Sequence, residues 1–78
     1  MKKVTIYSTP TCTYCHKAKS FFAEHSVAYE EKDVAGDSAA RAEMVQKSGQ
    51  MGVPVIDIEG TLITGFDEAA LRKELAIA

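Results

Sequence analysis

The chain has little that would attract it to a nucleic acid or a membrane. Its net charge is −2, so no excess of either sign draws it to nucleic acid or to an acidic lipid surface. Its longest apolar runs, such as residues 53–56, are far too short to cross a bilayer. It also lacks the basic stripe and the array of aromatic residues that nucleic-acid binding requires. We therefore expect no nucleic-acid partner and no membrane partner.

Internal repeats, low-complexity segments and an interdomain linker are also missing. A length of 78 residues then predicts one domain, residues 1–78, with a small core that must pack efficiently. Polar residues 8–13 interrupt any apolar segment after Met1-Lys2-Lys3, so we expect no export signal and a cytoplasmic location. In a reducing compartment, a pair of cysteines indicates a functional dithiol more than a structural disulfide.

Cysteine is scarce but concentrated, because Cys12 and Cys15 are the only two in the chain. They follow a strand-like run and stand where a helix-like run begins. Free N–H groups and the macrodipole at a helix N-terminus favour an anion, and the thiolate is the form that attacks disulfides. The spacing therefore predicts a redox centre in which Cys12 is the nucleophile and Cys15, on the apolar stripe of the helix, is the resolving thiol.

Three other uses of this cysteine pair fit the sequence less well. A structural zinc site needs about four ligands, and only His16 and His25 are available besides the cysteines, so no metal site is expected. Cys12 to His16 reads C-x-x-C-H, which is also the haem-attachment signature, but that signature assumes an exported protein with a haem cavity. An inert structural pair is disfavoured by the exposed position at a helix start.

Turn residues and hydrophobic periodicity predict seven elements. Alternating β-branched and aromatic residues indicate strands, and apolar residues three and four positions apart indicate helices. The predicted strands cover residues 3–8, 27–33, 53–58 and 61–64, and the predicted helices cover residues 12–25, 38–47 and a last segment after residue 67.

The predicted order is β-α-β-α-β-β-α. Its β-α-β start implies parallel pairing of the first two strands, and Glu59-Gly60 is a two-residue turn that makes the last two strands antiparallel. Helices on both faces of a mixed four-stranded sheet close such a chain. We therefore predict an α/β protein with three helices in the thioredoxin-like arrangement.

Helix ends and faces can also be predicted. Gly49 fits the C-terminal end of the second helix, and Asp67 can cap the third. Lys17 and Lys19 are expected to face water. The residues expected to face the core are Cys15, Ala18, Phe22 and His25, then Ala42 and Val45, then Ala70, Leu71 and Leu75.

Pro54 opens the third predicted strand. It could simply begin an edge strand, or it could form a cis bond with Val53 and so expose the Val53 backbone to an incoming chain. Only about 5% of X–Pro bonds in folded proteins are cis, so the physics of the sequence leaves both readings open.

Three segments of the chain resemble the glutaredoxin family. Residues 6–19, which contain Cys12-Thr13-Tyr14-Cys15, look like the active-site segment of that family. Residues 48–54 resemble its cis-proline segment, and Gly65-Phe66-Asp67-Glu68 resembles its third motif. The motifs occur in the right order and span nearly the whole chain. The resemblance implies a thiol-disulfide oxidoreductase with a cis Val53–Pro54 bond.

The resemblance also implies a substrate site. Glutathione would be the co-substrate, no cofactor would be bound, and disulfide-containing proteins would be the partners of a monomer. The positions that match the glutathione site of the family are Tyr14, Val53, Pro54, Asp67 and Glu68.

Some positions depart from the family pattern. The substituted residues are Thr9 for a lysine, Thr13 for the proline of C-P-Y-C, Gly52 for a threonine and Thr64 for a glycine. Losing the lysine removes a charge partner for a glutathione carboxylate, and Lys17 and Lys47 are the candidates to replace it.

These departures open two alternatives. One is a redoxin reduced by thioredoxin reductase, serving ribonucleotide reductase or similar targets. The other is a glutaredoxin that holds a [2Fe–2S] cluster between two subunits. In the first of these, protein partners would dock around Cys12, Tyr14, Val53 and Phe66.

Overall fold

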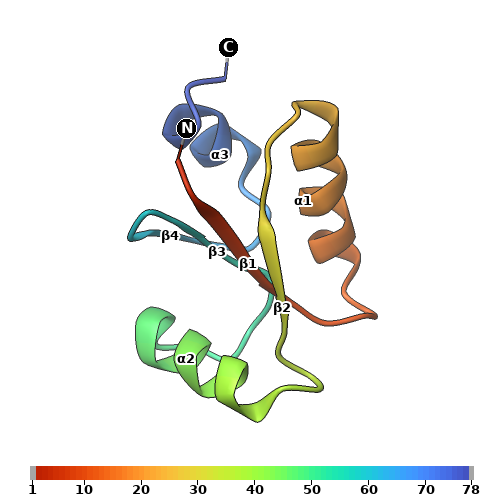
Figure 1. Cartoon of the computed structure of the whole chain (residues 1–78), viewed down its shortest axis with the longest axis vertical. Coiled ribbons are helices and arrows are strands. Elements are labelled where there is room, and N and C mark those ends of the chain that lie inside the picture. The colour runs from red at the N-terminus through yellow and green to blue at the C-terminus, as the bar shows by residue number, and fades with distance from the viewer. Residues whose placement is uncertain (1, 78) are drawn as a thin grey trace.

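A computed structural model describes residues 2–77 of the chain (Figure 1). Seven elements follow one another in the predicted order β-α-β-α-β-β-α. They are β1 (Val4–Ser8), α1 (Thr13–Glu24), β2 (Glu30–Asp33), α2 (Ser38–Ser48), β3 (Val55–Ile58), β4 (Thr61–Thr64) and α3 (Glu68–Glu74).

The four strands form one mixed sheet in the order β2-β1-β3-β4. Strand β1 is parallel to β2, with Ile6 opposite Glu31. It is antiparallel to β3, which is antiparallel to β4. The predicted thioredoxin-like arrangement is therefore confirmed. Strand β1 lies inside the sheet, and the segment that carries both cysteines leaves from its C-terminal end.

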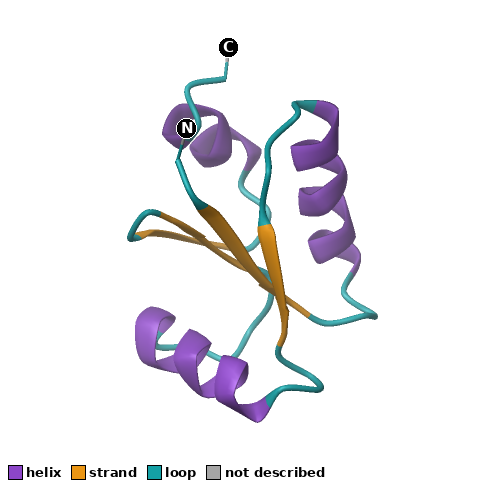
Figure 2. Cartoon of the chain, in the orientation of Figure 1, coloured by secondary structure: helices purple, strands orange, loops and turns teal. Residues whose placement is uncertain are grey.

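Helices cover both faces of the sheet, with α1 and α3 on one side and α2 on the other (Figure 2). Each face has its own buried cluster. The cluster under α1 and α3 consists of Val4, Ile6, Ala18, Phe21, Phe22, Ile56, Ile58, Ile63 and Leu71. The cluster under α2 consists of Tyr7, Val34, Ala40, Met44 and Val55. None of the helices within residues 2–77 has the length and apolarity that a bilayer crossing requires.

Local sequence explains the predicted turns and caps. Glu59 and Gly60 both have positive φ, 48° and 97°, as a two-residue turn between antiparallel strands requires. Gly49 ends α2 with φ of 74°, in the left-handed region where a glycine has no Cβ to clash. Asp37 caps α2 by accepting from the N–H groups of its first turn, and Asp67 caps α3 in the same way.

The second predicted strand is too long. Residues 27–29 lie outside β2, which begins at Glu30. The apolar side chains of Val27 and Tyr29 suggested a strand, but they pack against α1 and its cluster: Val27 borders the first cluster, and the rings of Tyr29 and Phe22 lie 5.2 Å apart. Strand β2 itself consists of charged residues and is largely exposed at the edge of the sheet.

The predicted inner face of α2 is wrong for Ala42, which is exposed. Val45 is half-buried and packs against the cluster under α2, in which Ala40 and Met44 are the buried residues of the helix. The small alanines in this helix give a weak apolar stripe, so Met44 decides which face turns inward. Two smaller differences from the prediction concern β3 and His25. Strand β3 begins at Val55, after Pro54. His25, which was expected to face the core, is the half-buried C-cap of α1.

A charged network joins α2 to the sheet. Buried Tyr7 donates its hydroxyl to Glu43, and the Lys32 ammonium lies 2.7 Å from the same carboxylate oxygen. Hydrogen bonds from Lys32 and Tyr7 lower the pKa of Glu43 to about 2. A carboxyl whose pKa falls on folding stabilises the fold above its unfolded pKa, and that contribution is lost as the pH drops toward the folded pKa.

We therefore predict that Glu43→Gln is less stable than the wild type at pH 7 and that the gap closes from about pH 5 to about pH 2. Urea unfolding midpoints of both proteins across this range measure the gap. Gln46→Ala, an uncharged exposed site on the same helix, should follow the wild-type pH profile. A gap that is as large at pH 2 as at pH 7 would contradict the prediction.

Candidate active site

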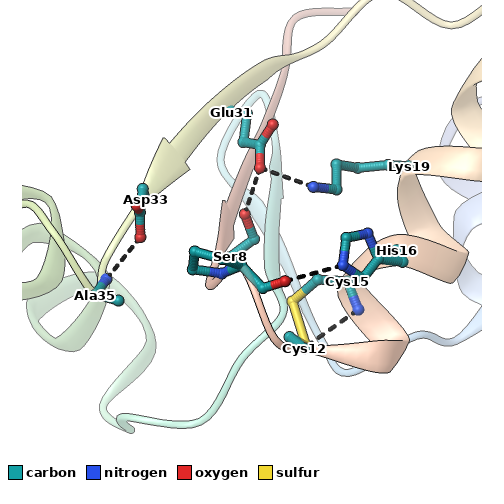
Figure 3. Close-up of polar contacts among 9 residues, drawn as sticks. Ser8, Cys12, Cys15, His16, Lys19, Glu31, Asp33 and Ala35 are labelled. Atoms are coloured by element: carbon teal, nitrogen blue, oxygen red, sulfur yellow. Dashed lines mark hydrogen bonds and ion pairs between the residues drawn. A yellow bond between two sulfur atoms is a disulfide. The ribbon is translucent and has the colours of Figure 1, made fainter.

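The start of α1 holds the two cysteines in a disulfide, with their Cα atoms 5.2 Å apart (Figure 3). Cys12 is the N-cap of the helix, and its sulfur accepts the Cys15 backbone N–H at 3.1 Å. The Cys12 N–H itself donates to the Thr9 carbonyl. A sulfur in this position meets the unpaired N–H groups and the positive end of the helix macrodipole, which stabilise negative charge on it.

The two sulfurs differ in access. Cys12 is partly exposed, whereas Cys15 is completely buried. The difference follows from helix geometry, since Cys15 shares the inward face with Ala18 and Phe22 while the N-cap position projects from the end of the helix. An incoming disulfide can therefore reach Cys12 far more readily than Cys15.

Polar groups surround the dithiol. The His16 ring lies against the loop that precedes the helix, with Nε2 donating to the Pro10 carbonyl at 3.0 Å. Tyr14 is 58% exposed, and the Lys17 ammonium lies 5.2 Å from the centre of its ring. Tyr14 is thus an exposed aromatic residue between the cysteines, and its ring makes a cation–π interaction with Lys17 on the next turn.

The cis-proline segment and the third motif lie together. The Val53–Pro54 bond is cis, as the resemblance implied, and the Pro54 carbonyl accepts the Gly65 N–H at 2.8 Å. This bond fixes the third motif next to the segment before β3. Pro54 is buried and Val53 is half-buried.

A shallow groove of about 400 Å³ connects the third motif to the dithiol helix. Thr13, next to Cys12, lines it together with Phe66 and Glu68. Tyr14, Val53 and Asp67 lie outside its lining. Asp67 caps α3 through the Ala70 N–H, and Glu68 pairs with Arg72 at 2.9 Å. The sequence motifs therefore converge only partly on one groove.

Neither lysine proposed as a substitute for the missing one stands free. Lys17 lies over Tyr14, and Lys47 pairs with Asp57 at 3.0 Å on the α2 side of the sheet. Within residues 2–77, no group of three or more His, Cys, Asp or Glu residues is arranged to hold a metal ion.

Ser8, Lys19 and Glu31 form a cluster near the two cysteines and were not among the predicted site residues. The Ser8 hydroxyl and the Lys19 ammonium both contact the Glu31 carboxylate on β2, at 2.9 and 2.8 Å. Lys19, which was expected to face water, is half-buried. The only signal in the sequence was a polar Ser8 at a position that continues the buried alternation of Val4 and Ile6.

Comparison with known proteins agrees with this geometry. The glutaredoxin family model matches residues 4–63. A glutaredoxin-like 8.6 kDa protein encoded in the rubredoxin operon of Clostridium pasteurianum is 43% identical over 70 residues, which cover 90% of this chain and 93% of that protein. Glutaredoxin 3 of Escherichia coli is 40% identical over 68 residues, covering 87% and 82% of the two chains.

A solved structure extends the likeness to the whole chain. A mutant of the thioredoxin-like protein BC3987 has a TM-score of 0.92 and 36% identity, with complete coverage of both chains. Members of the matched family exchange thiols and disulfides, and Cys12 and Cys15 form the C-x-x-C disulfide of this chain. The chain belongs to the glutaredoxin family and is a dithiol thiol-disulfide oxidoreductase.

Proposed function

We propose that Cys12 is the attacking thiolate, that Cys15 is the resolving thiol and that glutathione is the reductant. The single observation that carries the first two roles is the contrast between the partly exposed N-cap sulfur of Cys12 and the buried sulfur of Cys15. A thiolate at a helix N-terminus is stabilised, whereas burial in apolar surroundings disfavours a thiolate.

The proposed cycle begins with the reduced protein. The Cys12 thiolate attacks one sulfur of a target disulfide, forms a mixed disulfide and expels the other sulfur as a thiolate, which takes up a proton. The Cys15 thiol then loses its proton and attacks the Cys12 sulfur, which releases the second target thiol and leaves the Cys12–Cys15 disulfide. Two glutathione molecules reduce it in the same two-step manner and leave as oxidised glutathione.

Glutathione carries one ammonium and two carboxylates, so its site needs backbone partners and charges of both signs. We propose that the Val53 backbone beside Pro54 pairs with its peptide and that Tyr14 flanks its sulfur. Asp67 and Glu68 supply negative charge for the ammonium. The Gly65-to-Pro54 hydrogen bond supports this assignment, because it ties the two segments to each other.

Partners and location follow from the same chemistry. Disulfide-containing proteins would meet the surface around Cys12, Tyr14, Val53 and Phe66, where Tyr14 is the most exposed side chain, at 58%. We propose a monomer in the cytoplasm, where glutathione keeps thiols reduced.

One assay separates glutathione from the alternative reductant. NADPH oxidation is followed with a disulfide substrate and either glutathione plus glutathione reductase or thioredoxin reductase alone, with Cys12→Ser as the blank. We expect turnover with the glutathione system. The alternative, reduction by thioredoxin reductase, rests on Thr9, which stands where a lysine would pair with a glutathione carboxylate. Turnover only with thioredoxin reductase would establish this alternative.

A further inference from the structure

An ion pair lies beside the dithiol on the face of the sheet that α1 covers. The Lys19 ammonium is 2.8 Å from Glu31 Oε2, and the Ser8 hydroxyl donates to the same oxygen at 2.9 Å (Figure 3). The three residues come from α1, β2 and β1. Lys19 follows Cys15 by four positions, so the two side chains lie on the same face of the helix.

The pair is held in place. Ser8 is 1% exposed and the Lys19 side chain is 19% exposed, so these two donors are held in place, whereas the Glu31 side chain that they hold is 42% exposed. Hydrogen bonds from Lys19 and Ser8 lower the pKa of Glu31. Glu31 is therefore a fixed anion near neutral pH, and Lys19 its fixed counter-charge.

We propose that this pair sets the redox equilibrium of the dithiol, with Glu31 cancelling the field that Lys19 would otherwise exert on the reduced centre. The inference rests on the proposed role of Cys12 as the thiolate. An unscreened Lys19 would stabilise that thiolate and so favour the reduced protein, whereas an unscreened Glu31 would favour the disulfide.

The size of the effect follows from Coulomb's law. Lys19 comes seven positions after Cys12, a separation along the helix axis of about 10 Å at a rise of about 1.5 Å per residue. One unit charge at that distance in a largely aqueous medium shifts a thiol equilibrium roughly two- to threefold. That change corresponds to about 9 to 14 mV, at about 30 mV per tenfold change for a two-electron couple.

The test compares Glu31→Gln, Lys19→Gln and the double variant in glutathione redox buffers at low salt. In the measured equilibrium, reduced protein and oxidised glutathione exchange two electrons and two protons to give the protein disulfide and two reduced glutathiones. We expect Glu31→Gln to favour the reduced protein two- to threefold and Lys19→Gln to favour the disulfide by a similar factor. The double variant should return close to the wild type.

A second ion pair and a measurement at high salt serve as controls. Lys47→Gln and Asp57→Asn break an ion pair of similar length on the opposite face and should leave the equilibrium unchanged. Raising the salt to about 1 M should reduce the equilibrium shifts of the Lys19 and Glu31 variants, because the Debye length is then only about 3 Å. Shifts of the same sign in both single variants, or no shift in either, would overturn the proposal.

A failure of the proposed role of Cys12 would appear in a different measurement from a failure of the charge-pair proposal. Glutathione serves here only as a chemical redox buffer, so the equilibrium shifts do not depend on its being the physiological reductant. Alkylation of each single-cysteine variant as the pH is raised reports which thiol ionises first. If Cys15 reacted at lower pH than Cys12, the assignment of the nucleophile would fail, while opposite-signed equilibrium shifts would still support the charge pair.

Discussion

Cys12→Ser should lose all thiol-disulfide exchange activity, because serine at the N-cap keeps the cap and the helix but cannot form the mixed disulfide. Turnover in the coupled NADPH assay should fall to the rate measured with no redoxin added, a loss of at least about a thousandfold, since without the thiolate no covalent step begins. Because serine is a preferred N-cap residue, the unfolding midpoint should stay close to that of the reduced wild type.

Cys15→Ser is the matched variant, and it should behave differently. Its Cys12 remains at the helix start, so it should still attack oxidised glutathione and stop as a mixed disulfide that mass spectrometry detects. Exchange that survives in Cys12→Ser but not in Cys15→Ser would reverse the two roles.

Phe22→Ala should have the largest effect on stability. Phe22 is completely buried in the cluster beneath α1 and α3, and truncation of such a side chain costs about 3–5 kcal/mol, from lost transfer energy and the cavity left behind. A domain of this size has a total stability of only about 4–12 kcal/mol. The variant should therefore lose a large part of its free energy of unfolding and should unfold at a much lower urea concentration than the wild type, as followed by circular dichroism.

Tyr29→Ala provides the comparison. The Tyr29 ring lies 5.2 Å from that of Phe22, but Tyr29 is 37% exposed, so its removal opens the cluster to solvent and leaves no sealed cavity. Its loss of stability should be clearly smaller. Equal losses in the two variants would show that burial at Phe22 does not dominate the core.

Features that depend on residues close together in sequence could be predicted. The Cys12–Cys15 spacing, the Glu59-Gly60 turn, the Gly49 helix end and the Asp67 cap each act within a few residues. Local physics fixes such features, and their order along the chain then limited the topology to the arrangement observed.

Features that depend on a distant partner could not be predicted. Tyr29 reads as a strand residue because it alternates with charged neighbours, whereas in the structure its ring packs against Phe22 on α1. Ala40 and Ala42 are indistinguishable in isolation, and only the fit of Met44 beneath α2 decides between them. Glu31 is separated from Lys19 by twelve residues, so the ion pair beside the dithiol exists only once β2 pairs with β1.

The charged composition of β2 also affects how the folded chain meets other copies of itself. A four-stranded open sheet has two edges, and unpaired edge groups invite strands from neighbouring molecules. At one edge, four successive charged residues of β2 oppose such pairing. The other edge, β4 (Thr61–Thr64), carries no charge. We therefore expect strand-to-strand aggregation at high concentration to begin at β4, and a lysine introduced there to be the simplest way to suppress it.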